Sequence, residues 1–511
     1  MLALAAAAAG LALGGCSVGG DEEEGPATLA PANAPVYFDF LVRPEGEAAE
    51  DAEAALGKVI DSDDPGAELV SLLEREAAAD GEDFDYETEI EPWLGERVGF
   101  FFLTLGNETT GALVAEMSDP GKALEFVKSQ ADATGEEREY EGSTYELDSD
   151  GDASGIVDDF LVVGDVEGFK AAVDTSNGNS LAESDEFKDS IDDLPEERLA
   201  TFYALPKDSL NAIPEAEIDP QGRAFFLQAI GDAGDQPVLG DLTASEEAVT
   251  VEFSVAGGEV ETDESGLLEQ LPANAWLGLG LADIGGSVQN GLESLDSAGL
   301  PGLDAATVRQ QLRRQSGINL EQDVVNTLGD AALFLEGTTL KNVGGALVIE
   351  SKDPAASAGL IAKLQGLIKR LGDPKEVKVQ PLASATGDQG FQLIDPTGEL
   401  AQPVRVVQRG ERIVAGYGPS SIEEALAGDQ GGAQTLSGSP AFTSAKESLG
   451  DLGLDAFLSF APVFQLAESA GAAADPDYKR AKPYVDSLDF LALGSGSEGD
   501  RASVRFVIGL K

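Results

Sequence analysis

The sequence Gly-Ala-Leu-Val occurs twice in the chain, at residues 111–114 and at residues 345–348. Each copy is followed by Asp-Pro, at 119–120 and at 353–354, so both elements recur with the same offset of 234 positions. Recurrence of several elements at one spacing is typical of a chain built from repeated structural units. The pair of segments therefore indicates how the whole fold is organised.

Further matching segments extend this repeat in both directions and keep the same order in both halves. The pairs are Leu29–Ala34 with Leu271–Ala275, Trp93–Phe101 with Thr327–Leu335, Phe160–Gly164 with Arg412–Gly416, Ala200–Tyr203 with Ala456–Ser459, and Val251–Val255 with Val504–Ile508. Colinear matches of this number indicate a tandem duplication. We predict an α+β fold of two copies, 29–260 and 261–511, each a mainly antiparallel sheet packed with helices.

Alternation of apolar and polar residues predicts strands within each copy. Residues 36–40 read Val-Tyr-Phe-Asp-Phe, a period of two that predicts a strand with one buried face. Strand patterns also stand next to one another at 97–104 and 111–117, and again at 404–408 and 412–417. Adjacent strands joined by short connections form hairpins, so we expect antiparallel pairing.

Helical patterns follow the two Asp-Pro elements. Asp119 and Asp353 are predicted N-caps, because a proline at the first helical position needs no N–H partner. After Asp353 an apolar stripe runs along one helix face, consisting of Leu360, Ile361, Leu364, Leu367, Ile368 and Leu371. Such a stripe is expected to be core, with the lining of a lipid pocket as the alternative. Trp93 is likewise expected to pack in the core rather than stack on a ligand.

The first sixteen residues, MLALAAAAAGLALGGC, are uncharged and apolar and end in the only cysteine of the chain. The apolar run is too short to span a bilayer and has the length of a signal-peptide core. Its end, Leu13-Gly14-Gly15-Cys16, resembles the lipobox of bacterial lipoproteins, in which the cysteine thiol carries diacylglycerol. We predict a signal peptide with lipidated Cys16 at 1–16 and a solvated acidic tether at 17–28, whereas an ordinary free cysteine is the alternative. The expected location is the extracytoplasmic side of the cell membrane, with the membrane contacted through the anchor.

The composition excludes several classes of function. The chain has 511 residues, no histidine and one cysteine, which excludes histidine-dependent triads, histidine zinc sites and internal disulfides. Its formal charge of −62 argues against nucleic-acid binding, since phosphate would be repelled. Residues 1–260 hold 61 acidic and 12 basic side chains, whereas 261–511 hold 33 and 20. This asymmetry suggests cations or a basic protein as a partner of the first copy, and a merely solubilising surface is the alternative.

One segment offers a calcium-like arrangement of carboxylates. Asp148, Asp150, Asp152 and Asp159 occupy positions 1, 3, 5 and 12 of a loop, the spacing at which oxygen ligands surround calcium. Ala153 stands where such loops require glycine, and the segment lies between two strand patterns instead of two helices. A plain hairpin loop is the favoured interpretation, with a weak calcium site as the alternative; no other cofactor is expected.

Three of these features resemble a family of bacterial lipoproteins and secreted proteins of unknown function, known mainly from actinobacteria. They are the Pro-Ala-Asn-Ala opening before a strand, the Trp-Leu-Gly element at 93–95, and the Gly-Ala-Leu-Val strand that leads to Asp-Pro. The resemblance covers most of residues 29–511. Because the family has no established catalytic residues, it implies an architecture and no reaction.

These observations favour a non-enzymatic, lipid-anchored protein that binds a partner or acts as a scaffold. The alternative is a carrier of a lipid or another apolar ligand in a pocket between sheet and helices. A hydrolase that uses two carboxylates is the third possibility, because acidic residues are abundant. A roomy apolar cavity would favour the carrier, and two converging carboxylates in a cleft would favour the hydrolase.

Overall fold

A computed structural model describes residues 25–511 except 61, 63, 81–84, 131–134, 219, 258–264, 299–303, 374, 383–387 and 429–433. The predicted signal segment and Cys16 lie outside the described residues. None of the helices in the described part of the chain is long and apolar enough to cross a membrane. The fold is α+β with antiparallel strand pairing.

The chain divides into two compact units. Unit 1 comprises Met1–Glu259 with Gly499–Ser503 and Leu510–Lys511, and unit 2 comprises Val260–Glu498 with Val504–Gly509. Each unit has its own hydrophobic core, and the strands within each unit pair antiparallel.

The sheet of unit 1 contains ten antiparallel strands. They are β1 (Val36–Leu41), β2 (Leu94–Thr104), β3 (Thr110–Met117), β4 (Glu136–Tyr140), β5 (Ser143–Leu147), β6 (Asp152–Val157), β7 (Phe160–Asp165), β8 (Ala200–Ala204), β9 (Val238–Ala244) and β10 (Ala248–Ala256). They pair in the order β4-β5-β6-β7-β3-β2-β1-β8-β9-β10. β1 thus lies in the interior of the sheet, between β2 and β8.

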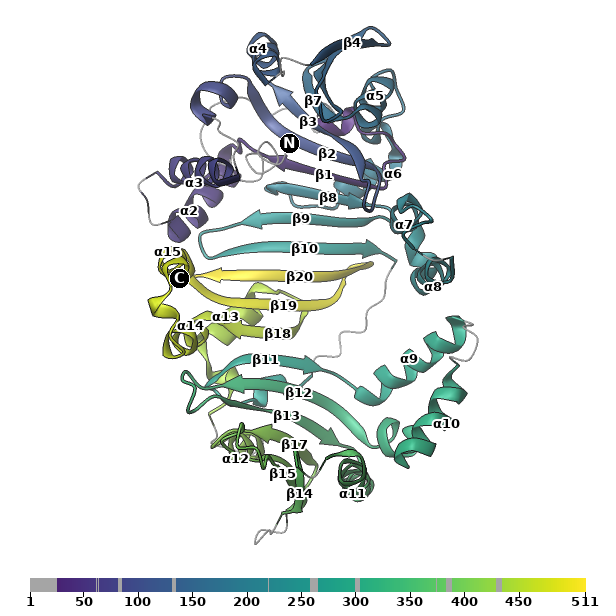
Figure 1. The fold of residues 1–511 in the computed structure, drawn as a ribbon, viewed down its shortest axis with the longest axis vertical. Coiled ribbons are helices and arrows are strands. Elements are labelled where there is room, and N and C mark those ends of the chain that lie inside the picture. The colour runs from purple at the N-terminus through teal and green to yellow at the C-terminus, as the bar shows by residue number, and fades with distance from the viewer. Residues whose placement is uncertain are drawn as a thin grey trace. The chain divides into compact units, whose positions relative to one another are not determined.

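The helices of unit 1 lie on the two faces and at the strand ends of this sheet (Figure 1). They are α2 (Gly46–Ile60), α3 (Pro65–Asp80), α4 (Pro120–Gln130), α5 (Val166–Thr175), α6 (Asp185–Ile191), α7 (Pro206–Ala212) and α8 (Pro220–Ile230). The main core contains Phe169 of α5 and Phe187 of α6 with Tyr37, Phe101 and Tyr203 of the sheet. A second cluster on α4 encloses Trp93, whose side chain is 1% exposed, so its predicted place in the core is confirmed.

The sheet of unit 2 follows the same order of pairing. Its strands are β11 (Ala275–Leu281), β12 (Leu328–Glu336), β13 (Gly344–Ser351), β14 (Lys378–Pro381), β15 (Gln389–Ile394), β16 (Val404–Arg409), β17 (Arg412–Tyr417), β18 (Gly453–Ser459) and β19 (Leu488–Glu498); β20 (Arg501–Leu510) follows them and is divided between the two units. The order is β14-β15-β16-β17-β13-β12-β11-β18-β19. When β1–β9 are matched with β11–β19, the two sheets therefore have one topology.

The helices of unit 2 fall at corresponding points of the chain. They are α9 (Ile284–Ala298), α10 (Ala305–Ser316), α11 (Pro354–Leu371), α12 (Ser421–Ala427), α13 (Pro440–Ser448), α14 (Phe460–Ser469) and α15 (Pro476–Val485). Leu360 and Ile361 of α11 pack with Phe391 and Ile413 in one core cluster. The same helix ends at Leu371, which is 75% exposed, so the predicted apolar stripe leaves the core in its last turn.

Both predicted N-caps are confirmed. Asp353 accepts hydrogen bonds from the backbone N–H groups of Ala355 and Ala356, and Asp119 accepts from those of Gly121 and Lys122. The predicted hairpins are present as β2 with β3 and β16 with β17.

Steric contact with the neighbouring strand explains why each Gly-Ala-Leu-Val segment begins with glycine. A Cβ on Gly111 would lie 2.1 Å from the carbonyl oxygen of Phe101, and a Cβ on Gly345 would lie 2.3 Å from that of Phe334. Both contacts are shorter than any real carbon–oxygen contact, so only glycine allows the neighbouring strand to approach.

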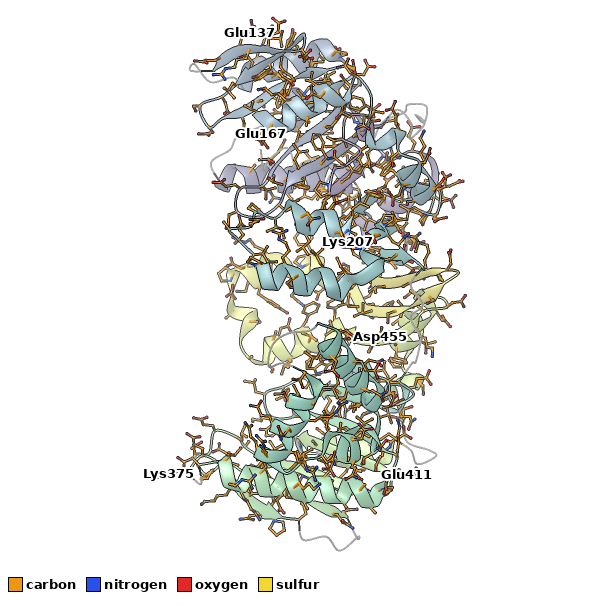
Figure 2. All side chains as sticks on the ribbon, turned by 90° about the vertical axis from the view of Figure 1, so that its right-hand side faces the viewer. Glu137, Glu167, Lys207, Lys375, Glu411 and Asp455 are labelled. Carbon is orange, nitrogen blue, oxygen red and sulfur yellow. The ribbon has the colours of Figure 1, made fainter. Side chains whose placement is uncertain are left out.

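Acidic side chains outnumber basic ones by 61 to 12 in residues 1–260, and Figure 2 labels two of them, Glu137 and Glu167. Glu137 lies on the exposed strand β4, and Glu167 lies in the first turn of α5, where the positive end of the helix dipole favours a carboxylate.

The alternation over residues 36–40 is observed, and its more deeply buried side is the one with Tyr37 and Asp39. Tyr37 is 1% and Asp39 is 8% exposed, whereas Val36, Phe38 and Phe40 are only partly buried. Phe38 and Phe40 of β1 therefore face away from the main core, which contains Tyr37.

Candidate functional site

A row of four phenylalanine rings crosses the sheet of unit 1 on the face opposite its main core. Phe38 on β1 contacts Phe102 on β2 at 6.2 Å and Phe202 on β8 at 4.9 Å between ring centroids. Phe202 in turn contacts Phe253 on β10 at 5.6 Å. We call Phe102, Phe38, Phe202 and Phe253 the aromatic row.

Strand register places these rings on one face. Phe38 pairs with Phe202, and both Phe202 and Phe253 pair with Gly240 of β9. Residues that lie opposite one another in a ladder point to the same face of the sheet. Gly240 carries no side chain, so the rings of Phe202 and Phe253 meet above it. The row therefore continues across five adjacent strands without interruption.

The aromatic row remains partly exposed to solvent. None of its four members belongs to the buried core clusters of unit 1, and each is only partly buried. Figure 1 shows α2 and α3 at one end of these strands and α7 and α8 at the other. From β2 to β10 the row takes four inter-strand steps of about 4.8 Å, which gives a length of about 19 Å.

Unit 2 presents an apolar face at the same place in its topology. The leucines concerned, which we call the leucine face, are Leu277, Leu279 and Leu281 on β11, Leu333 and Leu335 on β12, Leu347 on β13, Leu458 on β18, and Leu491 and Leu493 on β19. Pairs such as Leu279 with Leu333 and Leu333 with Leu347 are directly opposite in the ladder. Leu279 is 38% and Leu281 is 52% exposed, far more than a covered sheet face would allow.

The helix α14, which follows β18, is apolar over most of its length. Its sequence is FAPVFQLAES, yet it contains no buried residue, and the rings of Phe460 and Phe464 stack on one another at 6.0 Å. α14 contacts β11 and β19, the strands on either side of β18. The apolar side chains of α14 are thus only partly buried.

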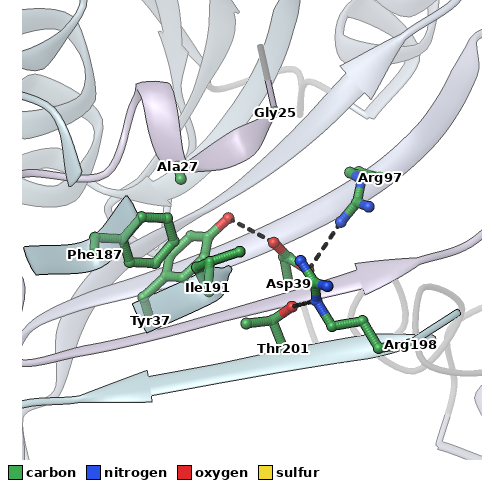
Figure 3. Close-up of a pocket in the computed structure, with 9 residues that line it drawn as sticks. All are labelled: Gly25, Ala27, Tyr37, Asp39, Arg97, Phe187, Ile191, Arg198 and Thr201. Atoms are coloured by element: carbon green, nitrogen blue, oxygen red, sulfur yellow. Dashed lines mark hydrogen bonds and ion pairs between the residues drawn. The ribbon is translucent and has the colours of Figure 1, made fainter. Parts of the chain in front are cut away.

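A small polar cavity of about 20 Å³ lies on the other face of the unit 1 sheet (Figure 3). Tyr37 donates a hydrogen bond from Oη to Oδ2 of Asp39 at 3.2 Å, and Nη1 of Arg97 lies 3.3 Å from Oδ1 of Asp39. Nε of Arg198 donates to Oγ1 of Thr201 at 3.1 Å. Because these residues belong to β1, β2, β8 and the segment before β8, the cluster joins the strands that carry the aromatic row.

The size of this cavity decides its role. A volume of about 20 Å³ holds about one water molecule, whereas sites for small organic ligands need about 300–1,000 Å³. Burial raises the pKa of the Tyr203 hydroxyl, whose ring contacts that of Phe187 in the cavity wall. The cluster is therefore a buried polar support beneath the aromatic row and not a site for a metabolite.

The structure separates the carboxylates of the predicted calcium loop. Asp148, Asp150 and Asp152 lie at the turn between β5 and β6, whereas Asp159 lies in the turn between β6 and β7. The six-residue strand between these turns keeps Asp159 about 17 Å from Asp152, far beyond the reach of one ion. Oδ1 of Asp148 accepts hydrogen bonds from the backbone N–H groups of Asp150 and Asp152, which is the geometry of a plain hairpin turn.

The electrostatics of this turn follow from burial and like charge. Burial and the neighbouring Asp148 carboxylate raise the pKa of Asp152 above its ordinary value. Across the described residues, no group of three or more carboxylate or cysteine side chains is arranged to hold a metal ion. The predicted four-ligand loop is therefore not assembled, and Cys16, the predicted lipidation site, lies in the part of the chain that is not described.

The aromatic row was not predicted, although a signal for it is present in the sequence. Phenylalanine recurs at alternate positions in the first strands, at 38 and 40 and at 100 and 102, and again at 202 and 253. Alternation alone does not tell which face meets the core, because aromatic residues are typical of either. Only the pairing of β1 with β8 and of β9 with β10 brings the four rings together.

Three comparisons with known proteins were informative to different degrees. A family model described as "Protein of unknown function (DUF3352)" matches residues 1–449. No curated protein matches the chain. Among solved structures, "Structure of crystal form I of TP0453" matches at 13% identity, covering 46% of this chain and 80% of that chain, with a TM-score of 0.25. A TM-score this low does not indicate a shared fold.

Proposed function

The chain belongs to the DUF3352 family of proteins of unknown function, and we propose that this member binds single acyl chains along the aromatic row of its unit 1 sheet. The observation that carries the proposal is the aromatic row, four partly exposed rings in mutual contact on one face. Partly exposed rings in mutual contact form one contiguous apolar patch, and such patches are typical of binding surfaces.

The dimensions of the row favour an extended acyl chain. The row is about 19 Å long. One leaflet of a bilayer provides about 15 Å of hydrocarbon, which is the length of a typical membrane acyl chain. Each methylene removed from water contributes about 0.8 kcal/mol, so a chain laid along four rings gains affinity along its whole length.

The net negative charge of residues 1–260 restricts the charge of the ligand's head group. Residues 1–260 carry 61 acidic against 12 basic side chains, so an anionic head group would be repelled. A ligand with an uncharged or cationic head, such as a monoacylglycerol, fits better than a free fatty acid. The acidic surface is therefore a source of selectivity for the head group.

We place this activity on the extracytoplasmic side of the membrane, with the chain anchored through Cys16. The lipobox-like sequence Leu13-Gly14-Gly15-Cys16 supports this location. We also infer that the two units arose by duplication, and the identical strand order of β1–β9 and β11–β19 supports that inference. On this basis the leucine face is a second apolar surface of the same origin.

The proposal assigns no catalytic step to the chain. The closely placed carboxyl groups of Glu336 and Glu424 do not support the hydrolase alternative, because Glu336 is only 2% exposed and out of reach of a substrate. A scaffold role would not need a row of partly exposed rings in mutual contact. Binding of acyl chains is therefore the function that the arrangement supports best.

Displacement of a fluorescent acyl probe from the full chain tests the proposal. Uncharged monoacylglycerols of increasing length should compete with affinities that rise about fourfold per methylene and level off once the chain exceeds the row. Phe202→Leu should weaken binding several-fold, since leucine keeps the strand apolar but removes the central ring contact. Leu124→Ser, on the exposed side of α4, is the matched control and should leave binding unchanged.

Two outcomes would overturn the proposal. One is equal affinity for short and long chains, which would indicate adsorption without a defined row. The other is an equal loss of binding in Phe202→Leu and Leu124→Ser, which would place the ligand elsewhere.

A further inference from the structure

Basic side chains gather where α10 and α11 end in unit 2. Arg313 and Arg314 lie in the last turn of α10, and Lys369 and Arg370 lie in the last turn of α11. Nη2 of Arg370 donates a hydrogen bond to the backbone carbonyl of Gln315 at 3.1 Å, which brings the two helix ends together. We call these four cationic residues the basic cluster.

The basic cluster is unusual for a chain of this composition. The sequence has 94 acidic side chains for 32 basic ones, so nearly three carboxylates are available for each cation. Arg97 and Arg409 accordingly pair with aspartates. Neither α10 nor α11 contains an acidic residue, and among the described residues no carboxylate lies within ion-pair distance of the basic cluster.

Packing of the two helices turns the basic cluster outward. Leu312 of α10 and Leu360, Ile361 and Ile368 of α11 point into the core cluster of this part of unit 2. The four cationic side chains of the basic cluster are exposed to solvent. Lys375, labelled in Figure 2, follows α11 and projects from the same end of the unit.

An exposed leucine stands directly beside these cations. Leu371 follows Arg370 and is 75% exposed, the largest exposure of any large apolar side chain in the described residues. Cations at a helix C-terminus interact favourably with the helix dipole, but that interaction needs neither two converging helices nor an exposed leucine. Cations without ion-pair partners suit a layer of anionic groups, and a protruding apolar side chain suits hydrocarbon below that layer. The combination therefore fits a surface that has anionic groups on the outside and hydrocarbon beneath them.

We propose that the basic cluster and Leu371 dock unit 2 onto the surface of an anionic phospholipid bilayer. The cations would contact lipid phosphates and Leu371 would enter the interface below them. The total charge of −62 does not prevent this contact at physiological salt, because the Debye length is then about 8 Å and the bilayer interacts with the nearest charges alone. The proposal goes beyond acyl-chain binding and does not depend on the aromatic row, so each can fail separately.

Vesicle flotation with the full chain carrying Cys16→Ser tests this docking without an acyl anchor. At 0.15 M NaCl the protein should float with phosphatidylglycerol–phosphatidylcholine vesicles and remain behind with pure phosphatidylcholine. Removing all four cations, R313Q/R314Q/K369Q/R370Q, should reduce the bound fraction at least tenfold. Leu371→Ser should reduce it several-fold without changing its dependence on salt.

The matched control removes the same charge elsewhere. The variant K122Q/K128Q/K188Q/K341Q neutralises four exposed lysines outside the basic cluster and should bind like the parent chain. Thermal melts of all variants should coincide within a few degrees, which excludes unfolding as the cause of any loss. Losses of equal size in the two quadruple variants would overturn the proposal, since net charge alone would then govern binding. Equal flotation with neutral and anionic vesicles, or binding to an acidic protein or nucleic acid in preference to vesicles, would overturn it as well.

Discussion

Asn274 donates a hydrogen bond of 2.9 Å from Nδ2 to Oε2 of Glu336, which joins the start of β11 to the end of β12. The asparagine belongs to the Pro-Ala-Asn-Ala element, which is recognised in the sequence only as a repeat. The hydrogen bond shows what this asparagine does in the structure of unit 2. Ser421 of α12 donates a second bond to Oε1 of the same carboxyl group. Glu336 is thus a buried junction between two strands and a helix.

Replacing Glu336 by glutamine should raise the stability of unit 2 above pH 7. Burial, and after it a hydrogen bond with Glu424, raise the pKa of Glu336 from 4.5 to about 7. The folded state therefore holds a proton that the unfolded chain releases, and stability decreases as the pH rises from about 4.5 to about 7. Glu336→Gln removes the charge; its one amide oxygen can still accept from Asn274, and its N–H₂ group can donate to the Ser421 hydroxyl, so we expect a gain of about 1–3 kcal/mol at pH 8.

Urea denaturation followed by tryptophan fluorescence measures this effect. The chain has two tryptophans, Trp93 in unit 1 and Trp276 in unit 2, so a Trp93→Phe background reports on unit 2 alone. At pH 4 the glutamine variant and its parent should have similar stability, because Glu336 is then protonated in both states. A pH dependence that survives in the variant would show that another group is responsible.

Local chemistry predicted those elements that depend on neighbouring residues. The aspartate–proline caps of α4 and α11 were predictable because the capping bonds run to the next two or three residues. The side of β1 that meets the core was not, because it depends on α5 and α6, which come more than a hundred residues later. The separation of Asp159 from the other carboxylates of the predicted calcium loop was not predictable either. It arises because β6 pairs with β7 as an extended strand, which lies between Asp152 and Asp159.

Asp165 should be among the most sensitive surface carboxylates of unit 1. Its Oδ2 accepts from the backbone N–H of Gly111 at 2.6 Å, and its Oδ1 accepts from the N–H groups of Glu167 and Gly168 at 2.9 Å. Asp165→Ala removes a helix cap and leaves a strand N–H without a partner, so we expect a loss of about 2–3 kcal/mol. Asp165→Asn keeps one acceptor oxygen and should cost about half as much. Urea denaturation monitored by Trp93 fluorescence in a Trp276→Phe background measures these losses. Equal free energies of unfolding for both variants and the parent would contradict the prediction.

Cys16→Ser should release the protein from membranes in a host that processes lipoproteins. Cys16 is the only thiol of the chain, so no other residue can form the thioether bond to diacylglycerol. Metabolic labelling with a fatty acid should mark the parent and leave the variant unlabelled, and fractionation should move the variant from the membrane pellet towards the soluble fraction. Labelling that persists in the variant would disprove lipidation at this position.

Gly240→Ala should separate the rings of Phe202 and Phe253. A Cβ at residue 240 would lie 2.8 Å from Cδ1 of Phe253 and 3.1 Å from Cβ of Phe202, so the Phe253 ring has to move away. We expect a cost of about 1–3 kcal/mol in stability together with weaker binding of a long monoacylglycerol.

A double-mutant cycle with Phe253→Ala identifies the cause of that loss. In the Phe253→Ala background the added methyl group meets no ring, so Gly240→Ala should cost clearly less there than in the parent chain. The binding defect of the two substitutions together should equal that of Phe253→Ala alone, because both interrupt the aromatic row at the same contact. Additive effects on stability and on binding would instead mean that Gly240 acts through the β9 backbone, and that the contact between Phe202 and Phe253 is not part of the binding surface.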